Sequence, residues 1–203
     1  LLIRRPPRST LFPYTTLFRS RRGLGLSERL FAYTPIVFVV HPSVTDIDNL
    51  NSQEILDIYS GKTRNWAKLG SVDHKIYPIT REPGDSSLTV INEHLAGFRV
   101  IDTSTAKTIY NTPDTVDALK KHRYTIGYTA LSEVKNSKLR VLKLDGIYPS
   151  AENITNGKYK LIVPLAIVYQ EEPSGLARTF IEFLGSKEGK KIITDFGSIP
   201  ASP

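Results

Sequence analysis

A short run of consecutive apolar residues limits most strongly what this chain can fold into. Residues 35–40 (Pro-Ile-Val-Phe-Val-Val) are apolar without alternation, and most are β-branched. A strand with one face in water alternates apolar and polar residues, so this unbroken run predicts a strand buried on both faces. Pro42 cannot donate to a strand ladder, which predicts that the strand ends at His41. Helices must therefore cover both faces of its sheet, and the expected fold class is α/β.

Helix and strand signals alternate at short spacing from residue 31 onward, as an α/β fold requires. Asn51 and Glu54 have the spacing of a capping box, and Gly61 can end that helix in the left-handed conformation. Later helices are predicted to begin near Pro83-Gly84, Thr112-Pro113-Asp114, Ser174 and Ser186, and strands are predicted at 75–80, 124–129, 139–144 and 161–169. The last two helices are expected to turn one apolar face inward, formed by Leu176, Ala177, Phe180, Ile181, Leu184, Ile192, Ile193 and Phe196.

The basic character of the chain is concentrated at its beginning. Six of the 27 Lys and Arg residues, and none of the 20 Asp and Glu residues, lie in residues 1–22, so the remainder carries a formal charge of only +1. This tail could be a disordered arm or an arginine-rich arm that binds nucleic acid. Residues 4–20, however, resemble the translation of a sequencing adapter. We therefore assign residues 1–22 no function and expect no nucleic-acid partner.

Several classes of chemistry are excluded by residues that the sequence lacks. Without cysteine there can be no disulfide, thiolate metal site or cysteine nucleophile. The four histidines lack the spacing of a metal site, and no nucleophile elbow, phosphate-cradling Walker loop or dinucleotide-binding glycine pattern is present. We therefore expect no catalytic residue, no metal, no cofactor and no enzyme activity. The chain has no methionine and begins at Leu1, which indicates a processed chain or a fragment.

The segment Arg81-Glu82-Pro83-Gly84-Asp85-Ser86-Ser87 has the composition of an anion site. It follows a predicted strand and opens a predicted helix, so unpaired main-chain N–H groups and the positive end of the helix would point at one place. Serine hydroxyls and the Arg81 guanidinium would add further donors. The alternative interpretation is a well-capped helix beside an incidental surface arginine. The carboxylate of Asp85 favours that alternative, because it repels an anion.

Seven motifs in order make residues 31–201 similar to the phosphate-type substrate-binding proteins of ABC transporters. The first two are the helix end Leu56-x-x-Tyr59-Ser60-Gly61-Lys62-x-x-x-Trp66-x-x-Leu69-Gly70 and the turn Pro78-Ile79-Thr80-Arg81-Glu82-x-Gly84. The others are Ile126-Gly127-Tyr128, Asp145-Gly146-x-x-Pro149-Ser150-x-x-Asn153-Ile154, Pro164-Leu165, Gly175-x-x-x-x-Phe180-Ile181-x-Phe183-Leu184-x-Ser186-x-x-Gly189 and Gly197-x-x-Pro200. The resemblance implies a two-lobed fold of the type II periplasmic-binding-protein class, with an anion held between the lobes.

The resemblance also implies a domain organisation. Residues 42–130 would form the second lobe, while 31–41 and 131–203 would supply the crossing strands and the remainder of the first lobe. Most of the N-terminal half of that first lobe would be missing. An incomplete lobe predicts unpaired strand edges and exposed apolar surface.

The ligand site implied by the resemblance consists of Arg81, Gly84, Asp85, Ser86 and Ser87. Relatives usually continue this turn as Gly-Ser-Gly-Thr, whereas Asp85 and Ser86 replace the small residues here, which predicts weaker phosphate binding. The implied function is capture of phosphate or a related oxyanion by hinge closure, as a monomer in the periplasm or outside the cell, for delivery to the membrane subunits of an ABC importer. The alternative is a degenerate sensor or adhesion-type module of the same fold with no role in phosphate transport.

Overall fold

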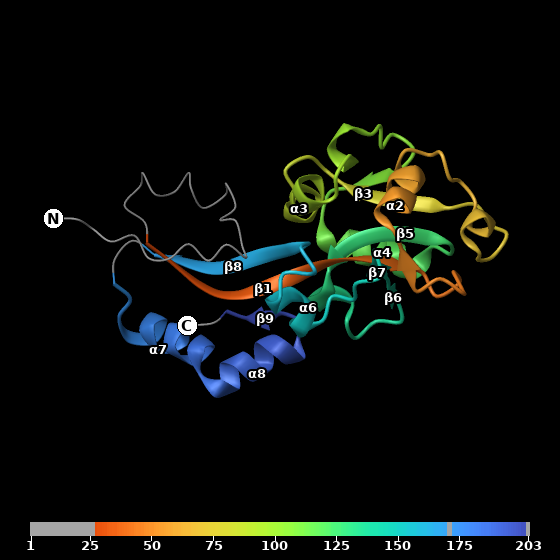
Figure 1. Cartoon of the computed structure of the whole chain (residues 1–203). Helices are drawn as coiled ribbons and strands as arrows, with labels where there is room; N and C mark the ends of the chain where they lie inside the picture. The colour runs from red at the N-terminus through yellow and green to blue at the C-terminus, as the bar shows by residue number, and fades with distance from the viewer. Residues whose placement is uncertain (1–26, 170–171, 202–203) are drawn as a thin grey trace.

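The fold is organised around one long strand, β1 (Ser27–Val40), in a computed structural model that describes residues 27–169 and 172–201 (Figure 1). Every residue from Ile36 to Val40 is buried, which confirms the predicted two-sided strand, and the strand ends at Val40, one residue before the predicted end at His41. The interpretation of residues 1–22 falls outside the described residues. No helix in the described ranges is long and apolar enough to cross a membrane.

The C-terminal half of β1 lies within a mixed sheet. The strand order is β4 (Lys107–Ile109), β3 (Tyr77–Arg81), β5 (Thr125–Ala130), β1 and β6 (Arg140–Val141). β3 runs parallel to β4 and to β5, whereas β1 runs antiparallel to β5 and β6. The parallel β3 and β5 therefore end at the same edge of the sheet, where loops can bring side chains together.

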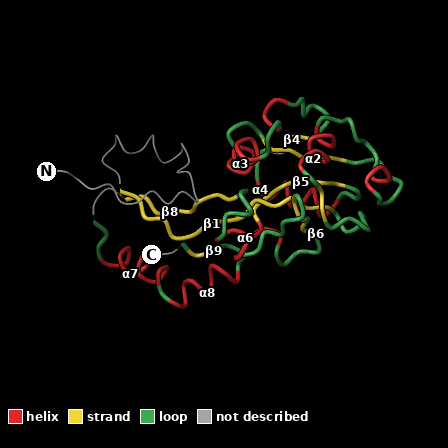
Figure 2. Tube along the Cα trace, in the orientation of Figure 1, coloured by secondary structure: helices red, strands yellow, loops and turns green. Residues whose placement is uncertain are grey.

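The N-terminal half of β1 has different partners. It pairs antiparallel with β8 (Ile162–Tyr169), and Ala32 and Tyr33 also pair with β9 (Ile199–Pro200). Figure 2 shows this part extending away from the compact body that holds β3, β4 and β5. β1 therefore connects two groups of strands, and β8 runs alongside it.

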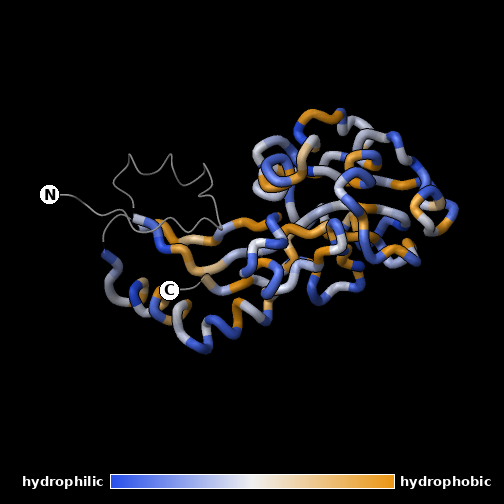
Figure 3. The backbone as a smooth tube through the Cα atoms, in the orientation of Figure 1, coloured by the Kyte–Doolittle hydropathy of each residue, from blue (hydrophilic) through white to orange (hydrophobic). Residues whose placement is uncertain are grey.

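Helices cover both faces of the sheet, because both faces of β1 are apolar. One face packs against α2 (Ser52–Tyr59) and α3 (Ser86–His94), in a core that includes Ile36, Phe38 and the fully buried Trp66. The other face packs against α4 (Thr112–Lys121) and α5 (Leu131–Val134), with Val37 and Val39 at its centre. Figure 3 shows the apolar stretch of β1 running into this body. The predicted α/β architecture is confirmed.

The predicted strand at 139–144 is divided in two. Val141 ends β6 beside β1, and the chain then pairs through β7 (Lys143–Leu144) with the parallel β2 (Asn49–Leu50). Farther along, α6 (Ala151–Thr155) adds Ile154 to the core, and the Tyr159 hydroxyl donates to the Ile36 carbonyl at 2.6 Å. Ile154 and Tyr159 thus pack against the same core as Ile36.

The last two helices, α7 (Gly175–Gly185) and α8 (Lys187–Asp195), do not bury the face predicted for them. Ile181 is buried, but Leu176, Phe180, Ile192 and Phe196 expose 89%, 56%, 43% and 63% of their surface. No described part of the chain covers this face. The inward orientation expected for these four residues is therefore wrong, whereas the exposed apolar surface expected for an incomplete lobe is present. Two short 3₁₀ helices, η2 (Trp66–Leu69) and η3 (Phe98–Val100), complete the described elements.

Candidate functional site

The predicted anion-binding turn connects the end of β3 to the start of α3. β3 ends at Arg81, Asp85 is the N-cap, and Ser86 and Ser87 are the first two helical residues. Gly84 has a φ of 96°, in the left-handed region that glycine adopts without the steric penalty of a side chain. The turn therefore has the strand–turn–helix geometry that its sequence predicted, and the five predicted residues lie together.

Arg81 is buried, not a surface residue, and its guanidinium is held from three directions. Its Nε donates to the Ile109 carbonyl at 3.1 Å, and its Nη1 donates to the Thr112 hydroxyl at 3.1 Å. Its Nη2 makes an ion pair with the Asp85 carboxylate at 3.0 Å. Only 5% of the Arg81 side chain is exposed. The strand end at Ile109 and the start of α4 at Thr112 therefore fix the guanidinium at the edge of the sheet.

Glu82 adds a second carboxylate to this arginine. Its Oε2 lies 3.2 Å from Arg81 Nε, and this hydrogen bond lowers the pKa of the Glu82 carboxyl below its ordinary value. With Asp85, the turn thus holds two carboxylates against one guanidinium. Among the described residues, the second N–H of Arg81 Nη1 has no acceptor.

Asp85 takes up the main-chain donors at the start of α3. Its Oδ1 accepts from the N–H of Ser87 at 2.9 Å and from the N–H of Leu88 at 3.0 Å, while its Oδ2 faces Arg81. A helix begins with main-chain N–H groups that have no partner within the helix, and an N-cap side chain satisfies some of them. Asp85 therefore uses donors that an external anion would need.

Ser86 and Ser87 keep donors that the protein does not use. Among the described residues, neither hydroxyl makes a hydrogen bond, and the main-chain N–H of Ser86 has no acceptor. Ser87 is 7% exposed, and Ser86 lies on the surface. These groups, with one N–H of Arg81, are what the turn can offer to an oxyanion.

Sequence reasoning missed three contributors to this geometry. Ile109 and Thr112 come from β4 and α4 and hold the guanidinium. Tyr128, in the motif Ile126-Gly127-Tyr128, also accepts a hydrogen bond from the main-chain N–H of Arg81 at 3.0 Å. Nothing in the spacing of these residues points to Arg81, because the parallel sheet is what brings them together.

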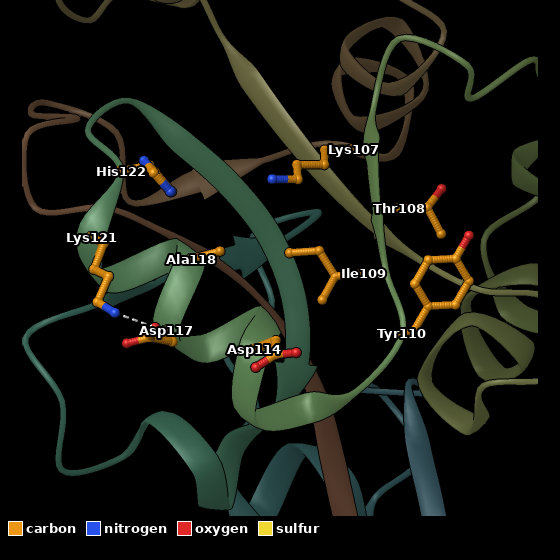
Figure 4. Close-up of a pocket in the computed structure, with 9 residues that line it drawn as sticks. All are labelled: Lys107, Thr108, Ile109, Tyr110, Asp114, Asp117, Ala118, Lys121 and His122. Carbon is orange, nitrogen blue, oxygen red and sulfur yellow. Dashed lines mark hydrogen bonds and ion pairs between the residues drawn. The ribbon is translucent and has the colours of Figure 1, made fainter.

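A separate hollow of about 430 Å³ lies between the edge strand β4 and α4 (Figure 4). Its charged lining residues are Lys107, Asp114, Asp117 and Lys121, and His122 also lines it. Lys121 is already paired with Asp117 at 2.6 Å. None of the five predicted site residues lines this hollow, so the turn at Arg81 remains the candidate site.

β1 is shared by two groups of strands, helices cover both faces of the sheet, and a polar turn precedes α3. Together these features are typical of a ligand-binding α/β fold. Residues 1–188 match the family described as a PBP superfamily domain, and the chain belongs to that family. It is 29% identical over 187 residues to the phosphate-binding protein PstS of Bacillus subtilis, covering 88% of this chain and 59% of that protein. The PstS of Borreliella burgdorferi is 27% identical over 183 residues, covering 85% and 65%.

Solved structures agree with these sequence relatives. A protein from Clostridium perfringens, described as a phosphate ABC transporter substrate-binding protein with bound phosphate, superposes with a TM-score of 0.78 at 27% identity, covering 90% of this chain and 75% of that one. PstS from Borrelia burgdorferi gives 0.62 at 25% identity, covering 95% and 78%. The chain is thus a distant homologue of phosphate-binding proteins, a family of binders and not of enzymes, with the expected type II fold. It spans 59% and 65% of the length of the two PstS relatives.

Proposed function

We propose that this chain is the ligand-binding part of an ABC import system, and that it captures phosphate or a related oxyanion at the turn between β3 and α3. Arg81, Gly84, Asp85, Ser86 and Ser87 form the site. The work of such a protein is done outside the cytoplasmic membrane, where the ligand is captured and passed as a 1:1 complex to the membrane subunits of the importer.

The observation that carries this proposal is the environment of Arg81. A buried guanidinium with one unused N–H lies beside the start of a helix, where the Ser86 main-chain N–H and two serine hydroxyls also have no described partner. Charge-assisted hydrogen bonds to an oxyanion are stronger than neutral ones, and a helix start adds a favourable dipole. The solved relative from Clostridium perfringens, whose description includes bound phosphate, supports the choice of ligand.

Capture by hinge closure is part of the same proposal. One lobe consists of residues 42–160, and the other contains the N-terminal half of β1 together with residues 161–201. The pairing of β6 and β7 and the contact between Tyr159 and Ile36 favour a boundary near residue 160 over the expected one at 130. β1 and β8 are then the crossing strands, and a small bend in them changes the distance between the lobes.

The proposal is tested by titrating the 203-residue chain with inorganic phosphate in a calorimeter. Ser87→Ala removes a hydroxyl with no described partner, so we expect weaker binding without a loss of stability. Arg81→Gln removes a charged donor worth about 1.5–3 kcal/mol, so we expect the affinity to fall by about ten- to a hundredfold. Arg99→Gln, at an exposed residue of η3, is the control and should leave the affinity unchanged.

The alternative function, a sensor or adhesion module of the same fold without a phosphate role, is favoured by one observation. The carboxylate of Asp85 already holds the Ser87 and Leu88 N–H groups and the Arg81 guanidinium. Folded protein that binds no phosphate, or binds it equally well after Arg81→Gln, would select this alternative.

A further inference from the structure

We infer that Asp85 is the specificity-determining residue of the turn, because its carboxylate occupies the position of a ligand oxyanion. The inference rests on the proposed function and names Asp85 as the residue that sets how tightly phosphate binds there. It has a direct consequence: a neutral side chain at position 85 makes this chain a tighter binder of phosphate than the natural residue does.

The geometry of Asp85 is that of a bound anion. One oxygen accepts from two consecutive main-chain N–H groups, those of Ser87 and Leu88, at 2.9 and 3.0 Å. The other oxygen lies 3.0 Å from Nη2 of Arg81. Helix starts bind phosphate and carboxylate with this combination of paired N–H groups and a nearby cation. Only 10% of the Asp85 side chain is exposed, so water screens its charge poorly.

The balance of charge points in the same direction. Arg81 contributes one positive charge, and Asp85 and Glu82 each lie within 3.2 Å of it with a carboxylate. The turn therefore has a net negative charge, and an approaching oxyanion meets repulsion that grows with the charge on the ligand. We expect the natural turn to favour singly charged oxyanions over doubly charged ones, since the added charge nearly doubles the repulsion.

Two substitutions separate the effect of the Asp85 charge from the effect of its side chain taking up the Ser87 and Leu88 N–H groups. Asp85→Asn keeps the size and the N-cap hydrogen bonds, because asparagine caps helices as well as aspartate does. It removes the charge and, with it, the ion pair to Arg81, because an amide NH2 replaces the oxygen that faces Nη2. Asp85→Gly removes the side chain and leaves the Ser87 and Leu88 N–H groups available, at a cost of only a few tenths of a kcal/mol to the cap. Asp102→Asn is the matched control, because Asp102 likewise accepts a main-chain N–H, that of Ser104 at 2.8 Å, but has no ion pair with Arg81.

The experiment is calorimetric titration of inorganic phosphate into the full chain and these variants at pH 7.5, with circular dichroism to verify folding. Removing a like charge within a few ångströms of the ligand should strengthen binding by about tenfold or more. We expect Asp85→Asn and Asp85→Gly to show this gain and Asp102→Asn to show none. An unchanged or weaker affinity in folded Asp85→Asn and Asp85→Gly would overturn the inference.

The proposed function is tested by the natural protein and the Arg81→Gln variant, not by the Asp85 variants. If natural protein binds phosphate and loses affinity after Arg81→Gln, the proposed site stands whatever the Asp85 variants do. If the Asp85 variants gain affinity, adding Arg81→Gln to Asp85→Asn should remove that gain. A gain that survives without Arg81 would overturn the inference, because it would place the bound phosphate elsewhere.

Discussion

The hydroxyl of Tyr128 accepts a hydrogen bond from the main-chain N–H of Arg81 at 3.0 Å, joining the middle of β5 to the last residue of β3. The same hydroxyl lies 2.8 Å from the Thr80 hydroxyl. Tyr128 is 1% exposed, and burial raises the pKa of its phenol, so the hydroxyl stays protonated and able to donate to Thr80. This contact holds the main chain of Arg81 at the end of β3.

Tyr128→Phe should lower the free energy of unfolding by about 1–3 kcal/mol, because it leaves the buried Arg81 N–H and Thr80 hydroxyl without this partner. Urea denaturation followed by the fluorescence of Trp66, the only tryptophan, measures this difference. Tyr110→Phe is the control, since Tyr110 is 75% exposed. Equal stability of the two variants would show that the Tyr128 hydrogen bonds contribute nothing net.

Asn51→Ala should lower the free energy of unfolding by about 0.5–2 kcal/mol, the usual effect of losing a helix cap. The Asn51 side chain accepts from the Glu54 N–H at 2.9 Å, and the Glu54 carboxylate accepts from the Asn51 N–H at 2.7 Å. Asn92→Ala, within α3, should be neutral or slightly stabilising, because alanine has the higher helix propensity. The two variants should therefore move the urea midpoint in different directions or by clearly different amounts.

Ile181 and Leu176 lie on the same helix and should differ sharply on truncation. Ile181 is 8% exposed, so Ile181→Ala should cost about 2–4 kcal/mol of unfolding free energy. Leu176 is 89% exposed, so Leu176→Ala should change it by less than about 0.5 kcal/mol. A large loss from Leu176→Ala would mean that the apolar face of α7 is covered in solution.

His94 should make the protein less stable in mild acid. Burial lowers the pKa of His94 below its ordinary value of 6.5, so the unfolded chain binds a proton more readily than the folded chain. Stability from this residue is present above pH 6.5 and is lost as the pH falls toward the lowered pKa of the folded state. His94→Gln should therefore lose less stability than the natural protein between pH 7 and pH 5. Parallel loss in both proteins would exclude His94 as the cause.

Local signals were sufficient wherever neighbouring residues determine the structure. The capping box of Asn51 and Glu54 forms as predicted, and Gly61 has the left-handed φ of 74°. Ser186 caps α8 and α4 begins at Thr112, both where helix starts were predicted, and Asn111 is the cap of α4. Asparagine and serine both satisfy main-chain N–H groups at a helix start.

Contacts between residues far apart in the sequence could not be predicted from local signals. The turn at Arg81 was recognised, but its guanidinium is held by Ile109 and Thr112, which the sheet places beside it. The apolar faces of α7 and α8 were predicted from periodicity alone, and periodicity indicates only that a face is apolar. Whether another element covers that face depends on packing, and here Phe180 and Phe196 remain exposed.

The pairing of Ala32 with Pro200 has a consequence for how the chain acquires its structure. β1 is among the first described segments to be synthesised, yet the strand that completes its N-terminal half lies at the end of the described chain. Contacts between residues so far apart require closure of a long loop, and proteins rich in such contacts fold slowly. β1 contains a continuous apolar run at residues 35–40, and its pairing with β9 requires residues 199 and 200 to have been synthesised. We expect early pairing with β5 and β8 to shield residues 27–40 from water during that interval.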